Sequence, residues 1–77
     1  MLTLYTKPGC TFCVKVKEEA RFLNAPLVEK DVRDEGVLDE LIALGGKRQV
    51  PYFVDDEAGV AFYGSDEIIA HLHARFK

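Results

Sequence analysis

The two cysteines of the 77-residue chain, Cys10 and Cys13, are separated by two residues. A disulfide between them closes a very short loop and constrains the unfolded chain little, so the pair is a poor structural staple. A thiolate can instead attack a substrate disulfide, form a mixed disulfide and be released by a second thiol. The spacing therefore favours thiol-disulfide exchange over a structural role.

The cysteine pair follows a turn and opens a helix. Lys7, Pro8 and Gly9 end a short apolar run, and a helical pattern begins at the cysteines. A free cysteine has a pKa of about 8.5, which a helix N-terminus and nearby cations lower to roughly 3.5 to 7.5. Lys7 can supply such a charge. We expect Cys10 to be the attacking thiolate, and Cys13, on the core face of the helix, to be the less exposed resolving thiol.

Two other uses of the cysteines are less favoured. One is a pair of buried structural thiols. The other is a zinc site, which needs about four ligands, and the remaining candidates, His71 and His73, lie two apart on a predicted helix, where side chains diverge. We expect no metal, and we expect both histidines to be partly exposed.

Four strand patterns and three helical patterns position these residues. The predicted strands are residues 2–6, 27–32, 50–54 and 60–63, and residues 55–59 connect the last two as a hairpin. The apolar stripes that predict the helices are Val16, Ala20 and Leu23; Val37, Leu38, Leu41 and Ile42; and Ile68, Ile69, Leu72 and Phe76.

Boundary signals frame the helices. The first should end at residues 24–26 (Asn-Ala-Pro), and the second should be capped by Asp34 and end at Gly45 and Gly46. Ser65 should cap the third helix, with Asp66 complementing its dipole. The order β-α-β-α-β-β-α predicts two parallel strands joined by a helix and then an antiparallel hairpin. The fold class is therefore α/β: a mixed four-stranded sheet flanked by three helices, thioredoxin-like, in a single domain over residues 1–77.

Composition excludes several classes of function. The chain is 48% hydrophobic and 30% charged with a net charge of −3, which is typical of a folded globular protein and lacks the basic footprint of nucleic-acid binding. It has neither a signal-peptide pattern nor an apolar run of the roughly 20 residues that span a membrane. We expect a cytoplasmic protein, monomeric, with no nucleic-acid or membrane partner.

Residues 5–13 (YTKPGCTFC), Val50-Pro51 and Gly64-Ser65-Asp66 resemble glutaredoxins in order and spacing, over essentially the whole chain. The resemblance implies a glutathione-dependent thiol-disulfide oxidoreductase that reduces protein disulfides and glutathione mixed disulfides. Its partners would be glutathione, as reductant, and disulfide-containing proteins.

The resemblance also implies a substrate site. The Val50-Pro51 peptide would be cis and face the cysteines, the Ser65 region would hold the γ-glutamyl carboxylate of glutathione, and Asp66 its ammonium. Lys7 and Gln49 would hold the glycyl carboxylate. The implied glutathione-binding residues are Lys7, Thr11, Phe12, Gln49, Val50, Pro51, Gly64, Ser65 and Asp66. Without the resemblance, Pro51 would simply begin a strand and Ser65-Asp66 would be an ordinary helix cap.

Two departures leave alternatives open. Thr11-Phe12 stands where many glutaredoxins have Pro-Tyr, and Tyr63-Gly64 where they have Gly-Gly. Relatives without that proline sometimes bridge an iron-sulfur cluster between two subunits; we expect no tightly bound cofactor and keep the cluster as a less favoured alternative.

Two rival functions also remain. Residues 48–51 resemble glutaredoxin-like proteins that are reduced by thioredoxin reductase and supply ribonucleotide reductase, although the Trp-Ser-Gly-Phe stretch of that group is absent. The second rival is a non-catalytic glutathione-binding module like the amino-terminal half of glutathione transferases. Such modules usually lack the paired cysteines and continue into a helical domain.

Overall fold

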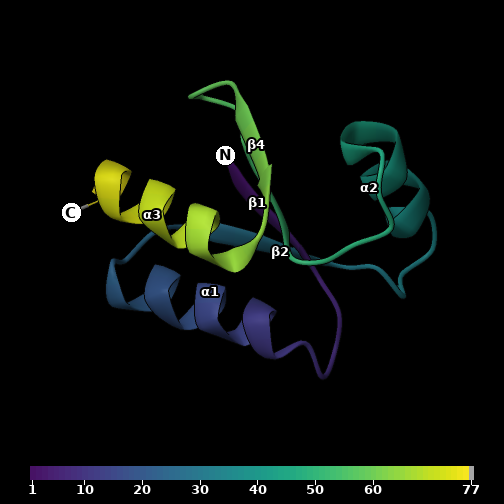
Figure 1. The fold of residues 1–77 in the computed structure, drawn as a ribbon, viewed down its shortest axis with the longest axis horizontal. Helices are drawn as coiled ribbons and strands as arrows, with labels where there is room; N and C mark the ends of the chain where they lie inside the picture. Colours follow the sequence, from purple (N-terminus) through teal and green to yellow (C-terminus); the bar gives the residue numbers. More distant parts are fainter. Residues whose placement is uncertain (77) are drawn as a thin grey trace.

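The computed structural model describes residues 1–76, and its elements follow the predicted order (Figure 1). The strands are β1 (Leu2–Thr6), β2 (Leu27–Asp31), β3 (Tyr52–Asp55) and β4 (Val60–Tyr63), and the helices are α1 (Thr11–Phe22), α2 (Val37–Gly45) and α3 (Ser65–Phe76). The sheet order is β2-β1-β3-β4, with β1 parallel to β2 and with β3 antiparallel to both of its neighbours. This is the predicted thioredoxin-like arrangement.

Helices cover the sheet on both faces. α1 and α3 lie side by side on one face, and α2 lies apart from them (Figure 1). Because side chains alternate along a strand, β1 contributes Leu4 to the core beneath α1 and α3 and Tyr5 to a second cluster beneath α2. Leu41 is the fully buried residue of α2 in that second cluster. β1 is therefore buried on both faces, as a central strand should be.

The start of α2 differs from the prediction. Gly36, at φ 82°, precedes the helix and caps it without a side chain, so Asp34 is not the N-cap. The reason lies upstream: the Asp31 carboxylate accepts the Arg33 N–H at 2.8 Å and the Arg33 guanidinium at 2.8 and 3.2 Å. These contacts fold the segment into turns, and the helix begins only at Val37.

Three further expectations were wrong in detail. Ile42 is 39% exposed, because it lies one residue, about 100° of helical rotation, beyond the buried Leu41. β3 begins at Tyr52 and not at residue 50, since Pro51 has no N–H to give to a ladder. Asp55 closes β3 as a fully buried residue and is not part of the hairpin connection.

The remaining core predictions are confirmed. Val16, Ile68 and Leu72 have no exposed surface. Within residues 1–76, none of the helices has the length and apolar character of a transmembrane span.

Candidate functional site

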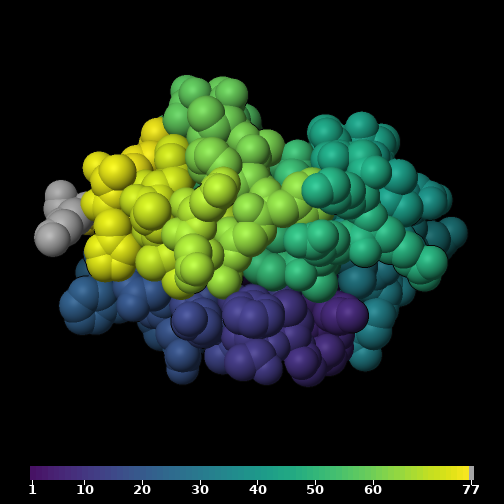
Figure 2. Space-filling model, viewed as in Figure 1, coloured from purple at the N-terminus to yellow at the C-terminus, as the bar shows by residue number. Residues whose placement is uncertain are grey.

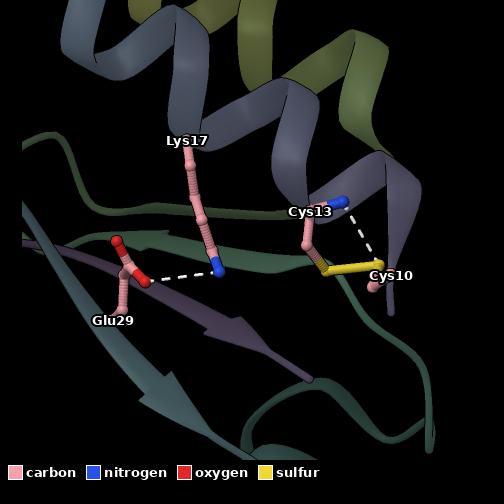
Figure 3. The surroundings of a disulfide bond; sticks show 4 residues. All are labelled: Cys10, Cys13, Lys17 and Glu29. Carbon is pink, nitrogen blue, oxygen red and sulfur yellow. Dashed lines mark hydrogen bonds and ion pairs between the residues drawn. A yellow bond between two sulfur atoms is a disulfide. The ribbon is translucent and has the colours of Figure 1, made fainter. Parts of the chain in front are cut away.

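Cys10 occupies the N-cap of α1. Its backbone is extended, at φ −84° and ψ 103°, and its sulfur accepts a hydrogen bond from the Cys13 N–H at 3.2 Å (Figure 3). Gly9, at φ 78°, turns the chain into this position, and the Cys10 N–H donates to the Lys7 carbonyl at 3.4 Å. A positive φ suits glycine because it has no Cβ. One of the free amides at the start of the helix is thus directed at the Cys10 sulfur, as predicted.

The two cysteines form a disulfide whose ends differ in exposure. Their Cα atoms are 5.2 Å apart, and Figure 3 shows the sulfurs bonded. Cys13, on the buried side of α1, is 0% exposed, whereas Cys10 is partly exposed. The expected asymmetry in exposure is confirmed, since Cys13 is buried and Cys10 is not.

An ion pair joins the cysteine-bearing helix to the sheet edge. Lys17 points from α1 to Glu29 on β2, with Nζ 3.3 Å from the carboxylate oxygen (Figure 3). Both side chains are partly exposed, so the pair is worth at most about 1 kcal/mol. Most of the positioning of α1 therefore comes from its buried apolar side.

A hollow of about 390 Å³ lies beside the start of α1 and brings most of the predicted glutathione-binding residues together. Its lining consists of Phe12, Gln49, Val50, Pro51, Tyr63, Gly64, Ser65, Asp66 and Glu67. On the surface, the purple α1 segment meets the green and yellow second half of the chain, which supplies the other residues (Figure 2). The Val50-Pro51 peptide in its wall is cis, as the resemblance implied.

The N-terminus of α3 forms one end of this hollow. Gly64 precedes the helix at φ 93°, and its carbonyl accepts the Ile68 N–H at 3.1 Å. Ser65 is the first helical residue and is 7% exposed, while Asp66 is exposed. Ser65 is thus part of the first turn, and the cap position that was predicted for it belongs to Gly64.

A second groove, of about 460 Å³, shares a wall with this hollow. Its lining consists of Lys7, Val32, Arg33, Leu38, Leu41, Arg48, Gln49 and Val50. Gln49 and Val50 line both spaces, and Lys7 lines only the groove. Thr11 is exposed on the first turn of α1, outside both linings.

Tyr63 is a residue of the hollow that sequence reasoning missed as a contributor. Its hydroxyl donates to the Lys47 carbonyl at 2.8 Å and accepts the Lys47 N–H at 3.1 Å. Its ring lies 4.5 Å from that of Tyr52, and a Cβ at Gly45 would collide with it. Tyr63 therefore holds the end of α2 and the start of the loop that leads to Gln49 and Val50. Two signals were available: Tyr63 is the last residue of a predicted strand, and Tyr63-Gly64 stands where many glutaredoxins have Gly-Gly.

Each histidine lies beside one carboxylate. His71 Nε2 is 2.8 Å from the Asp55 carboxylate, and His73 Nε2 is 2.8 Å from that of Glu19. Both histidines are partly exposed, as expected. Across residues 1–76, no three His, Cys, Asp or Glu side chains gather as a metal ion would require.

Burial and a charged neighbour shift the pKa of Tyr5, a residue of β1, the strand between β2 and β3. Burial, followed by Glu40 nearby, raises the pKa of Tyr5 to about 12. Its hydroxyl therefore stays protonated at physiological pH and supplies no charge to the neighbouring groove.

Comparison with known proteins assigns the chain at the level of family and fold. The model of the family described as "Glutathione S-transferase, N-terminal domain" matches residues 4–77. The solved structure of the thioredoxin-like protein BC3987 is 30% identical with a TM-score of 0.80, over 94% of this chain and 99% of that one. No curated protein matches significantly.

Two transferase structures share the fold. A glutathione S-transferase from the Antarctic clam Laternula elliptica has a TM-score of 0.81 at 24% identity, over 97% of this chain and 35% of that one. A glutathione transferase homolog from sulfitobacter, solved with bound glutathione, has a TM-score of 0.77 at 23% identity, over 99% of this chain and 37% of that one. The chain corresponds to about a third of each transferase.

Proposed function

The chain belongs to the glutathione S-transferase N-terminal domain family, and we propose that it works as a glutathione-dependent thiol-disulfide oxidoreductase of the glutaredoxin type. The observation that carries the proposal is the unequal cysteine pair: Cys10 at a helix N-cap, with the Cys13 N–H on its sulfur, and Cys13 buried behind it. A pair that served only to hold the fold would need neither a partly exposed first cysteine nor the hydrogen bond to its sulfur.

The chemistry follows from this asymmetry. The Cys10 thiolate attacks one sulfur of a protein disulfide, a new S–S bond forms, and the other substrate sulfur leaves as a thiolate that takes up a proton. Cys13 then loses its proton and attacks the Cys10 sulfur, which closes the internal disulfide and releases the second substrate thiol. Two electrons pass from the dithiol to the substrate. A glutathione mixed disulfide reacts by the same first step, and free glutathione can take the place of Cys13 in the second.

The hollow at the start of α1, which Phe12 of the cysteine motif lines, offers the groups that glutathione needs. Its volume of about 390 Å³ lies within the usual range for small-molecule sites. We assign the γ-glutamyl carboxylate to Ser65 and the amides at the N-terminus of α3, and the ammonium to Asp66. Gln49, at the wall shared with the groove, and Lys7, which lines the groove alone, would take the glycyl carboxylate. The remaining proposed contacts are Thr11, Phe12, Val50, Pro51 and Gly64.

Reduction by thioredoxin reductase is the second candidate, and one observation favours it. This chain covers 99% of BC3987, which is named thioredoxin-like, but only about a third of each transferase. In that case the cysteine chemistry is unchanged and only the electron donor differs. A non-catalytic glutathione-binding module is the third candidate, and the redox-ready cysteine pair argues against it.

We propose that the protein works without a resident cofactor, as a monomer in the cytoplasm, where thiols are kept reduced. An iron-sulfur cluster is held by four thiolates, and one chain with two cysteines would not complete that set. A cluster bridged between two subunits with glutathione stays the less favoured alternative.

An electron-donor comparison tests the proposal. The oxidised protein is offered glutathione with glutathione reductase, or thioredoxin reductase alone, and NADPH oxidation is followed with a small disulfide as acceptor. We expect turnover with glutathione; turnover with thioredoxin reductase alone would select the second candidate, and none with either would select the binding module. Cys10→Ser should abolish turnover, whereas Cys13→Ser should still reduce glutathione mixed disulfides.

A further inference from the structure

We propose that the 460 Å³ groove, called the cationic groove below, docks the acidic and apolar residues that flank the reactive cysteine of a protein substrate. The inference rests on the proposed function and names the class of protein disulfide that the site prefers. The groove lies between the segment that ends at Lys7, the start of α2 and residues 48–50.

The floor of the cationic groove is apolar. Leu41 is fully buried, and Val32, Leu38 and Val50 are partly buried around it. Glutathione ends in glycine, which has no side chain to cover such a floor. An apolar side chain of a longer polypeptide would cover it and gain free energy from the apolar surface removed from water. The floor therefore suits a protein segment better than the tripeptide.

The rim of the cationic groove is positively charged although the chain carries a net charge of −3. Lys7, Arg33 and Arg48 are exposed there, and no acidic residue is part of the lining. Arg33 is held by Asp31 at 2.8 Å, whereas within residues 1–76 no carboxylate forms an ion pair with Lys7 or Arg48. Arg48 is thus available for an acidic residue, and so is Lys7 whenever no glutathione is bound. Opposite charges at a rim guide encounter and register.

The groove adjoins the turn that carries Cys10, through Lys7. The Cys10 N–H donates to the Lys7 carbonyl, so the rim joins the cysteine turn directly. Gln49 and Val50 form the wall between the groove and the hollow assigned to glutathione. A substrate segment whose cysteine is bonded to Cys10 can therefore extend into the cationic groove.

The test uses symmetric peptide disulfides and the reduced protein, without glutathione. Three dimers are compared, and each consists of two copies of one short peptide joined through a central cysteine. The cysteine is flanked by leucine and glutamate in the first peptide, by leucine and lysine in the second, and by glycine and glutamate in the third. The rate of peptide-thiol release is measured by acid quenching and chromatography. Because each exposed charge pair contributes a factor of roughly 1.4 to 5, we expect the leucine-glutamate dimer to react several-fold faster than the leucine-lysine dimer and faster than the glycine dimer.

Arg48→Glu should reverse the preference for glutamate over lysine and leave the reduction of 2-hydroxyethyl disulfide unchanged. Arg21→Glu is the matched control, because Arg21 is an exposed arginine in the last turn of α1. This substitution changes the net charge by the same amount as Arg48→Glu. Equal rates for the acidic and basic dimers in the unaltered protein, or the same response in both variants, would overturn the docking proposal. Since these rates need no glutathione, a failure of the glutathione-coupled assay is a separate result.

Discussion

The backbone N–H of Cys13 donates to the Cys10 sulfur across 3.2 Å, while the Cys13 side chain itself has no exposed surface. One residue thus stabilises the outer sulfur through its amide and supplies the inner sulfur through its side chain. A hydrogen bond to the charged form of a group favours that form. The two sulfurs should therefore differ in both charge and access once the disulfide is reduced.

Alkylation measures this difference. In the reduced protein we expect iodoacetamide to modify Cys10 rapidly even below pH 7, since thiolates in such settings persist below the ordinary cysteine pKa of about 8.5. Cys13 should react only after unfolding. Peptide mapping by mass spectrometry at several pH values reads both rates, and faster labelling of Cys13 would reverse the assigned roles.

The cysteine site was predictable because its signals are local. A turn cluster at residues 7–9, two cysteines three positions apart and a helical apolar stripe all lie within one stretch of chain. The cis Val50-Pro51 peptide followed from the glutaredoxin resemblance, and not from proline alone. The element order was predictable for a similar reason, since each helix and strand carries its own periodicity.

Features set by contacts between distant segments were not predictable. Nothing near Tyr63 in the sequence indicates its bonds to Lys47, and nothing near Asp55 indicates that His71 lies beside it. The N-cap of α2 was predicted at the wrong residue for a similar reason, over a shorter distance in the sequence. Asp31 accepts hydrogen bonds from Arg33, and the turn that results leaves Asp34 outside the cap position. Helix, strand and capping preferences are read from residues that are close in the sequence. The contacts of Tyr63 and Asp55 depend instead on residues that only the fold brings close.

Asp55 should stabilise the fold in a pH-dependent way. Burial alone raises the pKa of Asp55, but hydrogen bonds from His71 and the Ala58 N–H, with Arg75 nearby, outweigh it, and the pKa lies below its ordinary value. A carboxylate whose pKa is lower in the folded state stabilises the fold in full when the pH is above its unfolded-state pKa of about 3.9. This contribution is lost as the pH falls through the folded-state pKa.

Asp55→Asn should therefore lower the free energy of unfolding at pH 7 by about 1.5 to 3 kcal/mol, the range for hydrogen bonds to a charged group. The difference between variant and unaltered protein should hold down to about pH 5 and shrink in stronger acid. Urea unfolding at each pH measures it. Asp56→Asn is the control, because Asp56 is exposed and pairs only with the chain terminus among residues 1–76; a difference that grew in acid would contradict the assigned sign.

Thr6 offers a test of a buried polar group beside the redox turn. Its hydroxyl is buried and has no hydrogen-bond partner among the described residues. Thr6→Val keeps the shape and removes that oxygen, so we expect stability to be unchanged or raised by up to about 1 to 3 kcal/mol, the cost of an unpaired buried polar group. Thr3→Val, at a similarly buried position of β1, controls for the strand preference of valine. A clear loss of melting temperature in Thr6→Val alone would mean that the hydroxyl has a partner in solution.

A substitution at Asp66 tests whether the N-terminus of α3 binds glutathione or is an ordinary helix end. If Asp66 accepts the γ-glutamyl ammonium, Asp66→Ala removes a charged hydrogen bond worth about 1.5 to 3 kcal/mol and should raise the KM for glutathione roughly 10- to 150-fold. If Asp66 only complements the dipole of α3, its loss costs about 0.3 to 1 kcal/mol of stability and leaves the KM unchanged. Glu67→Ala is the matched control, because Glu67 is the other acidic residue of the first turn and lines the same hollow. A raised KM in Asp66→Ala but not in Glu67→Ala, with similar melting temperatures, is the expected result. The same small fall in melting temperature in both variants, without a change in KM, would reduce Asp66 to a residue of the helix end, and the ammonium would then need an acceptor elsewhere.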